Sequence, residues 1–118
     1  MTTFYDKSGR PVVYCHDEVH VYAFSGEPLA YFRTNSVYSF NGSHVGWYLN
    51  GWIYDREGFA LVFSEKSRGG PLRPLKKLKP LRSLRMLRPL KSIRENRPLR
   101  PLLRSQWSSL RFEDLLDA

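Results

Sequence analysis

The chain has 118 residues and a formal net charge of +8, which is unevenly distributed. Residues 1–69 hold six Lys/Arg and seven Asp/Glu, for a net charge of −1, whereas residues 70–118 hold thirteen and four, for +9. The single Cys15 excludes an internal disulfide and is typical of a reducing compartment. No apolar run reaches membrane-spanning length, and the first residues lack the features of a signal peptide. We therefore expect one small, soluble, cytoplasmic domain with a basic appendage.

Residues 4–63 contain four copies of a repeat about 16 residues long, centred on Gly9, Gly26, Gly42 and Gly58. A tyrosine stands four residues before each glycine, an apolar residue precedes that tyrosine, and an aromatic residue follows the glycine by five. Aromatic and β-branched residues around a glycine that permits a tight turn predict a β-hairpin. Residues 1–69 are therefore predicted to form an all-β domain of four hairpins with pseudo-fourfold symmetry, which can close on itself and hide its edge strands.

Residues 70–105, which we call the arm, repeat every three residues. One position of the triplet is apolar, the next is basic, and the third collects prolines. The apolar positions are Leu72, Leu75, Leu78, Leu81, Leu84, Leu87, Leu90 and Ile93. The basic positions are Arg73, Lys76, Lys79, Arg82, Arg85, Arg88, Lys91, Arg94, Arg97 and Arg100. Polyproline II has three residues per turn and tolerates proline, so the pattern predicts a polyproline II arm with one apolar and one cationic edge.

A disordered basic tail is the alternative interpretation of the arm, but disordered tails are usually poor in large apolar residues. Fully extended in polyproline II, residues 71–104 would span about 105 Å, whereas a 69-residue domain is roughly 30 Å across. We therefore expect the domain to cover less than a third of the arm, and we expect leucine edges of several chains to meet in a homo-oligomer. Residues 106–118 are predicted to form a short helical segment.

The cationic edge offers contacts about 9 Å apart, which suits phosphates without base-reading geometry. Binding of nucleic acid, another polyanion or an acidic protein through this edge is the alternative function. A second alternative is a carbohydrate-binding module. The aromatic residues that would form its sugar platform are Trp47, Tyr48, Trp52 and Tyr54. In so small a domain, however, a role for these rings in the hydrophobic core is favoured.

Reactive residue types gather in only one stretch, formed by Cys15, His16, Asp17, Glu18 and His20. A nucleophile or metal site there is disfavoured, because the other repeats lack these residues and the stretch lies at the turn between two hairpins. We expect no enzymatic activity, no cofactor and no metal site.

Several motifs resemble those of the small bacterial 4-fold beta flower proteins. They are Phe-Tyr-Asp-x-x-Gly (4–9), Phe-Ser-Gly-Glu-Pro-Leu-Ala-Tyr (24–31), His-Val-Gly-Trp (44–47), Asn-Gly-Trp-Ile (50–53), Gly-Gly-Pro (69–71) and Trp-Ser-Ser-Leu (107–110). The resemblance covers nearly the whole chain and implies four hairpins around an axis. It implies no catalytic residue. Fold and resemblance together favour a non-enzymatic interaction or assembly protein.

Overall fold

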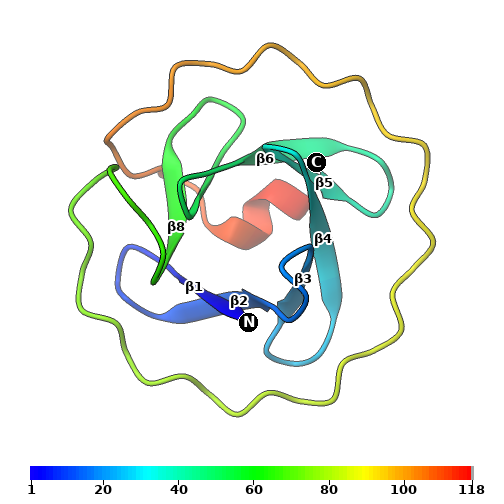
Figure 1. Cartoon of the computed structure of the whole chain (residues 1–118), viewed down its shortest axis with the longest axis horizontal. Helices are drawn as coiled ribbons and strands as arrows, with labels where there is room; N and C mark the ends of the chain where they lie inside the picture. The colour runs from blue at the N-terminus through cyan, green and yellow to red at the C-terminus, as the bar shows by residue number, and fades with distance from the viewer. Residues whose placement is uncertain (118) are drawn as a thin grey trace.

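The computed structural model describes residues 1–117, which form eight antiparallel strands closed into a barrel (Figure 1). The strands are β1 (Thr2–Tyr5), β2 (Pro11–Cys15), β3 (His20–Ala23), β4 (Pro28–Arg33), β5 (Ser36–Ser39), β6 (His44–Leu49), β7 (Trp52–Tyr54) and β8 (Ala60–Ser64). Neighbouring strands pair in chain order, and β1 pairs with β8 to close the ring. The predicted all-β fold of four hairpins with pseudo-fourfold symmetry is confirmed.

The sequence repeat determines the geometry of each hairpin. The strand register shifts at the same place in all four, between the apolar residue and the tyrosine that precede the turn, as between Phe4 and Tyr5. Each repeat glycine then adopts positive φ, from +81° at Gly9 to +96° at Gly26, where an L side chain would be strained. The turns between hairpins repeat too, because Glu18, Thr34 and Asn50 all have positive φ.

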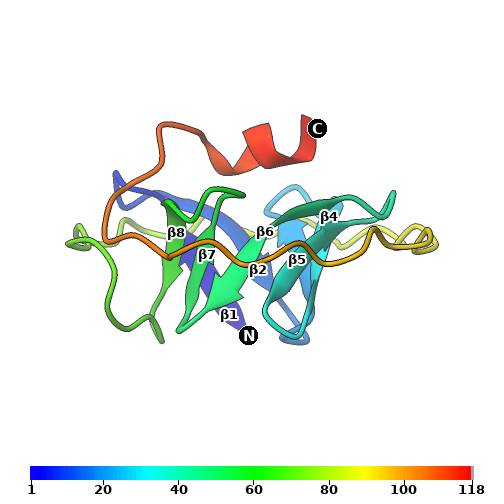
Figure 2. The same cartoon turned by 90° about the horizontal axis from the view of Figure 1, so that it is seen from above.

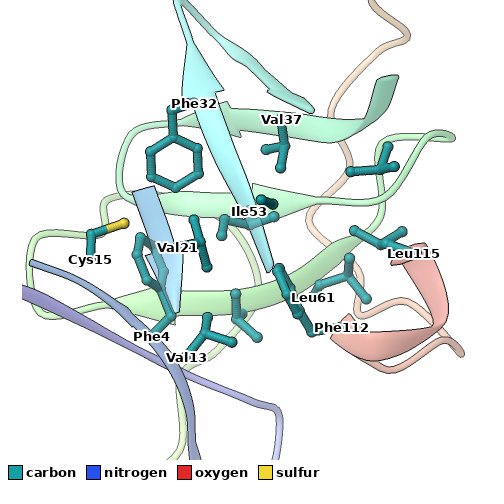
Figure 3. Close-up of a cluster of buried hydrophobic side chains, with 13 residues drawn as sticks. Phe4, Val13, Cys15, Val21, Phe32, Val37, Ile53, Leu61, Phe112 and Leu115 are labelled. Atoms are coloured by element: carbon teal, nitrogen blue, oxygen red, sulfur yellow. The ribbon is translucent and has the colours of Figure 1, made fainter. Parts of the chain in front are cut away.

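The interior of the barrel holds the apolar residues of the repeat (Figure 3). Phe4, Val21, Val37 and Ile53 occupy equivalent positions and are each 0 % exposed. The 3-10 helix η1 (Phe112–Asp117) lies over one end of the barrel (Figure 2), and its Phe112 and Leu115 are buried in the same cluster. A helical segment was predicted at 106–118, of which Ala118 lies outside the described residues.

The arm forms a ring around the outside of the barrel (Figures 1 and 2). Residues 72–104 contain neither helix nor strand, and the polyproline II conformation stays a prediction. The molecule measures 36 × 36 × 22 Å, so its circumference is about 110 Å, close to the length of about 105 Å expected for an extended arm. The expectation that the domain covers less than a third of the arm is wrong, because the arm bonds to all four hairpins.

Candidate functional site

The arm is attached to the barrel by a hydrogen bond that recurs every nine residues. The backbone N–H groups of Lys77, Met86, Glu95 and Arg104 donate to the carbonyls of Gly9, Gly26, Gly42 and Gly58, at 2.8, 2.9, 2.8 and 2.9 Å. Nine arm residues therefore span one hairpin repeat. A Cβ on any of these glycines would collide with an arm carbonyl, so the close approach of the two backbones also requires glycine.

The nine-residue period also explains the distribution of the prolines. Proline recurs at 71, 80, 89 and 98, six residues before each attachment point. Two middle hairpins receive a second hydrogen bond, from Ser83 N–H to the Phe24 carbonyl and from Ser92 N–H to the Phe40 carbonyl. The equivalent positions over the outer two hairpins are Pro74 and Pro101, which have no N–H to donate. The nine-residue period was not predicted from the sequence, although the spacing of the prolines reveals it.

Seven arm cations lie over aromatic rings of the barrel. The pairs, with distances to the ring centroid, are Lys76 on Tyr5 (5.9 Å), Arg82 on Tyr14 (5.3 Å), Arg85 on Tyr22 (5.9 Å), Lys91 on Tyr31 (4.5 Å), Arg94 on Tyr38 (5.9 Å), Arg97 on Trp47 (5.3 Å) and Arg104 on Phe59 (4.9 Å). A cation over a ring face is attracted by the ring quadrupole. The predicted cationic edge is thus in contact with the barrel along most of its length.

The remaining predicted cations are placed differently. Arg73 donates to Ser67, and Arg88 donates to the Tyr22 hydroxyl at 3.2 Å. For Lys79 and Arg100, no hydrogen bond, ion pair or ring contact is found among the described residues. These side chains are exposed and remain accessible to an anionic partner.

The apolar edge faces solvent. All eight predicted residues are at least 92 % exposed, and Leu99 and Leu102 extend the row at 97 % and 82 %. We call this set of ten side chains the leucine rim. Because the arm is a ring, the leucine rim runs around the circumference of the molecule. Monomeric soluble proteins rarely expose apolar surface on this scale, and such surfaces mark contact sites.

The structure pairs His20 with Asp17 near the turn between β2 and β3 and buries Cys15 in the core. Cys15 is 1 % exposed and packs in the central apolar cluster (Figure 3). Burial, with a smaller contribution from nearby Glu18 and Asp17, raises the pKa of its thiol far above the usual range. His20 Nδ1 lies 2.6 Å from Asp17 Oδ2 and its ring stacks on Phe40. Within residues 1–117, no three His, Cys, Asp or Glu side chains are grouped as metal ligands.

The aromatic residues considered as sugar platforms are mostly buried. Trp47, Trp52 and Tyr54 are 1, 0 and 5 % exposed, and the Trp52 indole donates to the Gly69 carbonyl at 3.1 Å. Tyr48 stacks on Phe32 with ring centroids 3.9 Å apart. A carbohydrate module needs exposed rings, so this observation removes the basis for that interpretation.

Comparison with known proteins identifies the family. The family model described as "4-fold beta flower protein" matches residues 2–116. No curated protein and no solved structure matches the chain. No helix among the described residues is long and apolar enough to cross a membrane. Because the match spans the barrel, the arm and η1, this chain belongs to the 4-fold beta flower family.

Proposed function

We propose that the protein is a non-enzymatic interaction protein whose copies associate through the leucine rim. The observation that carries the proposal is the ring of ten apolar side chains, each between 82 and 97 % exposed. Burying a leucine side chain is worth about 1.5–3 kcal/mol, so a fully hydrated leucine rim is costly. The buried Cys15 thiol and the buried tryptophans offer little to a substrate, which supports a binding role over a catalytic one.

The shape of the leucine rim determines the kind of assembly. Because each rim is convex, two copies that touch edge to edge bring together only about three leucines from each. Half-burying these six side chains contributes about 6 kcal/mol, at roughly 1 kcal/mol each. Association costs about 4 kcal/mol or more, so a single contact is weaker than millimolar. Stable assembly therefore needs several contacts per molecule. We expect assemblies larger than dimers that form cooperatively with concentration.

Salt provides a specific test of rim association. Copies of net charge +8 repel each other, so screening should favour assembly as the salt concentration rises. Substituting Leu78→Asp together with Leu84→Asp should make the assemblies smaller, as measured by sedimentation velocity and light scattering at low and high salt. The control is Ser8→Asp with Ser25→Asp, which adds the same charge at exposed hairpin turns and leaves the leucine rim intact. A monomer at every salt and protein concentration, or assemblies of unchanged size in the leucine double variant, would contradict the proposal.

A second candidate function, polyanion binding, is favoured by the cations that remain exposed along the arm. Binding to a polyanion should weaken as the salt concentration rises, opposite to rim association, because binding releases counterions from the nucleic acid. With six phosphates neutralised on a single strand, the log–log slope should be near −4, at roughly −0.7 per contact. The triple substitution Arg82→Gln, Arg85→Gln and Arg88→Gln should weaken binding and flatten the slope, as measured by fluorescence anisotropy with labelled DNA and RNA. Absence of binding at low salt would exclude this function.

A further inference from the structure

The apolar row of the arm is interrupted at one place, between the third and fourth hairpins. The row runs from Leu72 to Ile93, has Asn96 at the next triplet position, and resumes at Leu99. The residue before Asn96 is Glu95, the only acidic residue of the arm. Its position varies along the arm, with Lys77, Met86 and Arg104 at the equivalent places.

The barrel carries a polar residue beside this interruption. Two residues after the repeat glycine, the first two hairpins carry Pro11 and Pro28, the third carries His44 and the fourth carries Ala60. His44 is thus the polar residue at its repeat position, and its N–H donates to Glu95 of the arm.

These exceptional residues surround one cleft of about 440 Å³. It is lined by His44, Trp47, Arg56, Glu95, Asn96, Pro98 and Leu99, which come from β6, the β7–β8 turn and the arm. The cleft is large enough for a small organic molecule.

Hydrogen bonds hold the walls of the cleft in place. Glu95 Oε1 accepts from the His44 N–H at 2.6 Å, a bond that proline cannot make in the first two hairpins. Arg56 Nε donates to the His44 carbonyl at 3.2 Å, which leaves the rest of its guanidinium for another partner. The Arg97 guanidinium lies over the ring of Trp47, one of the lining residues, but Arg97 does not itself line the cleft.

Two residues that line the cleft carry buried polar atoms without a hydrogen-bond partner. Three buried side-chain polar atoms among the described residues have no partner, and two of them, His44 Nδ1 and Trp47 Nε1, belong to cleft residues. His44 and Trp47 are 5 and 1 % exposed. Buried polar atoms without a partner are uncommon in native proteins, and each one calls for an explanation. A bound molecule that reorders the cleft would supply partners.

The charges around the cleft select the ligand. Arg56 and Arg97 contribute two positive charges and Glu95 one negative charge, so the balance of +1 favours an anionic ligand. Guanidinium groups bind carboxylates through paired N–H donors. Burial, and then the charges of Arg97 and Arg56, lower the pKa of His44, so its imidazole is neutral and adds no further charge. Asn96 adds an amide at the arm side of the cleft.

We propose that this cleft binds a small organic carboxylate, with Arg56 as its principal anchor and Arg97 as a second cation. Such a site shares Leu99 with the leucine rim and Arg97 with the cationic edge, but its anchor, Arg56, belongs to neither. It would make the protein a small-molecule binder as well as an interaction protein.

The test is titration of the ¹⁵N-labelled full chain with succinate, followed by NMR. The indole N–H resonance of Trp47 should shift and saturate in the millimolar range expected for so small a ligand. Arg56→Gln should weaken binding about tenfold through the loss of one charge-assisted interaction. Arg97→Gln should weaken it by a smaller factor, and Glu95→Gln, which keeps an acceptor for the His44 N–H but removes the negative charge, should strengthen it.

Matched controls come from the repeat itself. Arg88→Gln removes the cation nine residues before Arg97 and should leave succinate binding unchanged. Asn96→Leu restores the triplet pattern and should narrow the cleft and abolish binding. A shift that does not saturate, equal binding by Arg56→Gln and wild type, or tighter binding of inorganic phosphate than of succinate would each overturn the carboxylate assignment.

Discussion

At the scale of single residues, the repeat tyrosines link the barrel to the arm. Tyr5, Tyr22 and Tyr38 are only 3, 3 and 4 % exposed although they lie on the outside of the barrel. Their rings lie beneath Lys76, Arg85 and Arg94 of the arm. Each such contact contributes about 0.5–1 kcal/mol at an exposed site, so no single pair fixes the arm and the attachment depends on their number.

His44 gives the protein a pH-dependent stability. Burial, together with Arg97 and Arg56, lowers the pKa of His44 in the folded state, whereas in the unfolded chain it returns to about 6.5. The unfolded state therefore binds more protons just below pH 6.5, and stability should fall as the pH decreases through this range. His44→Gln should remove this part of the pH dependence, measured by urea unfolding at pH 7.5 and pH 5.5.

The control for this prediction is His16→Gln, which replaces an exposed histidine in the β2–β3 turn. It should leave the difference in stability between the two pH values in place. Asp17 does not interfere in this window. Burial alone would raise the pKa of its carboxyl, but hydrogen bonds from His20 and Val19 lower it well below the usual range, so its contribution to stability is lost only as the pH falls below about 4. An unchanged pH dependence in His44→Gln would show that another group is responsible.

At the scale of elements, the hairpins could be predicted from the sequence because their determinants are local. Tyr5, Gly9 and Tyr14 lie within ten residues of one another, and the turn between them follows from glycine at positive φ. The path of the arm depends on contacts between distant residues, such as Met86 with Gly26. A period of three indicates the backbone type but does not reveal the surface on which the arm lies.

The attachment points of the arm can be tested by proline substitution. Met86→Pro removes the N–H that donates to the Gly26 carbonyl, which should cost about 1–2 kcal/mol and loosen the arm over the second hairpin. Leu87→Pro is the matched control, because proline suits an extended arm and the hydrogen bond of Met86 is kept. The readout is the rate of amide hydrogen exchange in the arm together with the thermal midpoint. Equal exchange rates for both variants would contradict the assigned role of Met86.

At the scale of the whole molecule, the two edges of the arm were predicted from its triplets, but the ring was not. The prediction compared the length of the arm with the diameter of the domain, whereas the relevant dimension is the circumference, about 110 Å for a disc 36 Å wide. The cleft between the third and fourth hairpins was not predicted either. Asn96 and Glu95 stand out as exceptions only after the nine-residue period aligns them with Leu87 and Met86.

The nine-residue attachment has a consequence for how such chains can change length. Each hairpin of about sixteen residues is matched by nine residues of arm, so the length of the arm is coupled to the number of hairpins in the barrel. Deleting one triplet from the arm would move every later donor a third of a hairpin out of step with its glycine. A relative with five hairpins would need nine more arm residues to cover the additional hairpin. Gain or loss of a hairpin in the barrel must therefore be accompanied by gain or loss of nine residues in the arm.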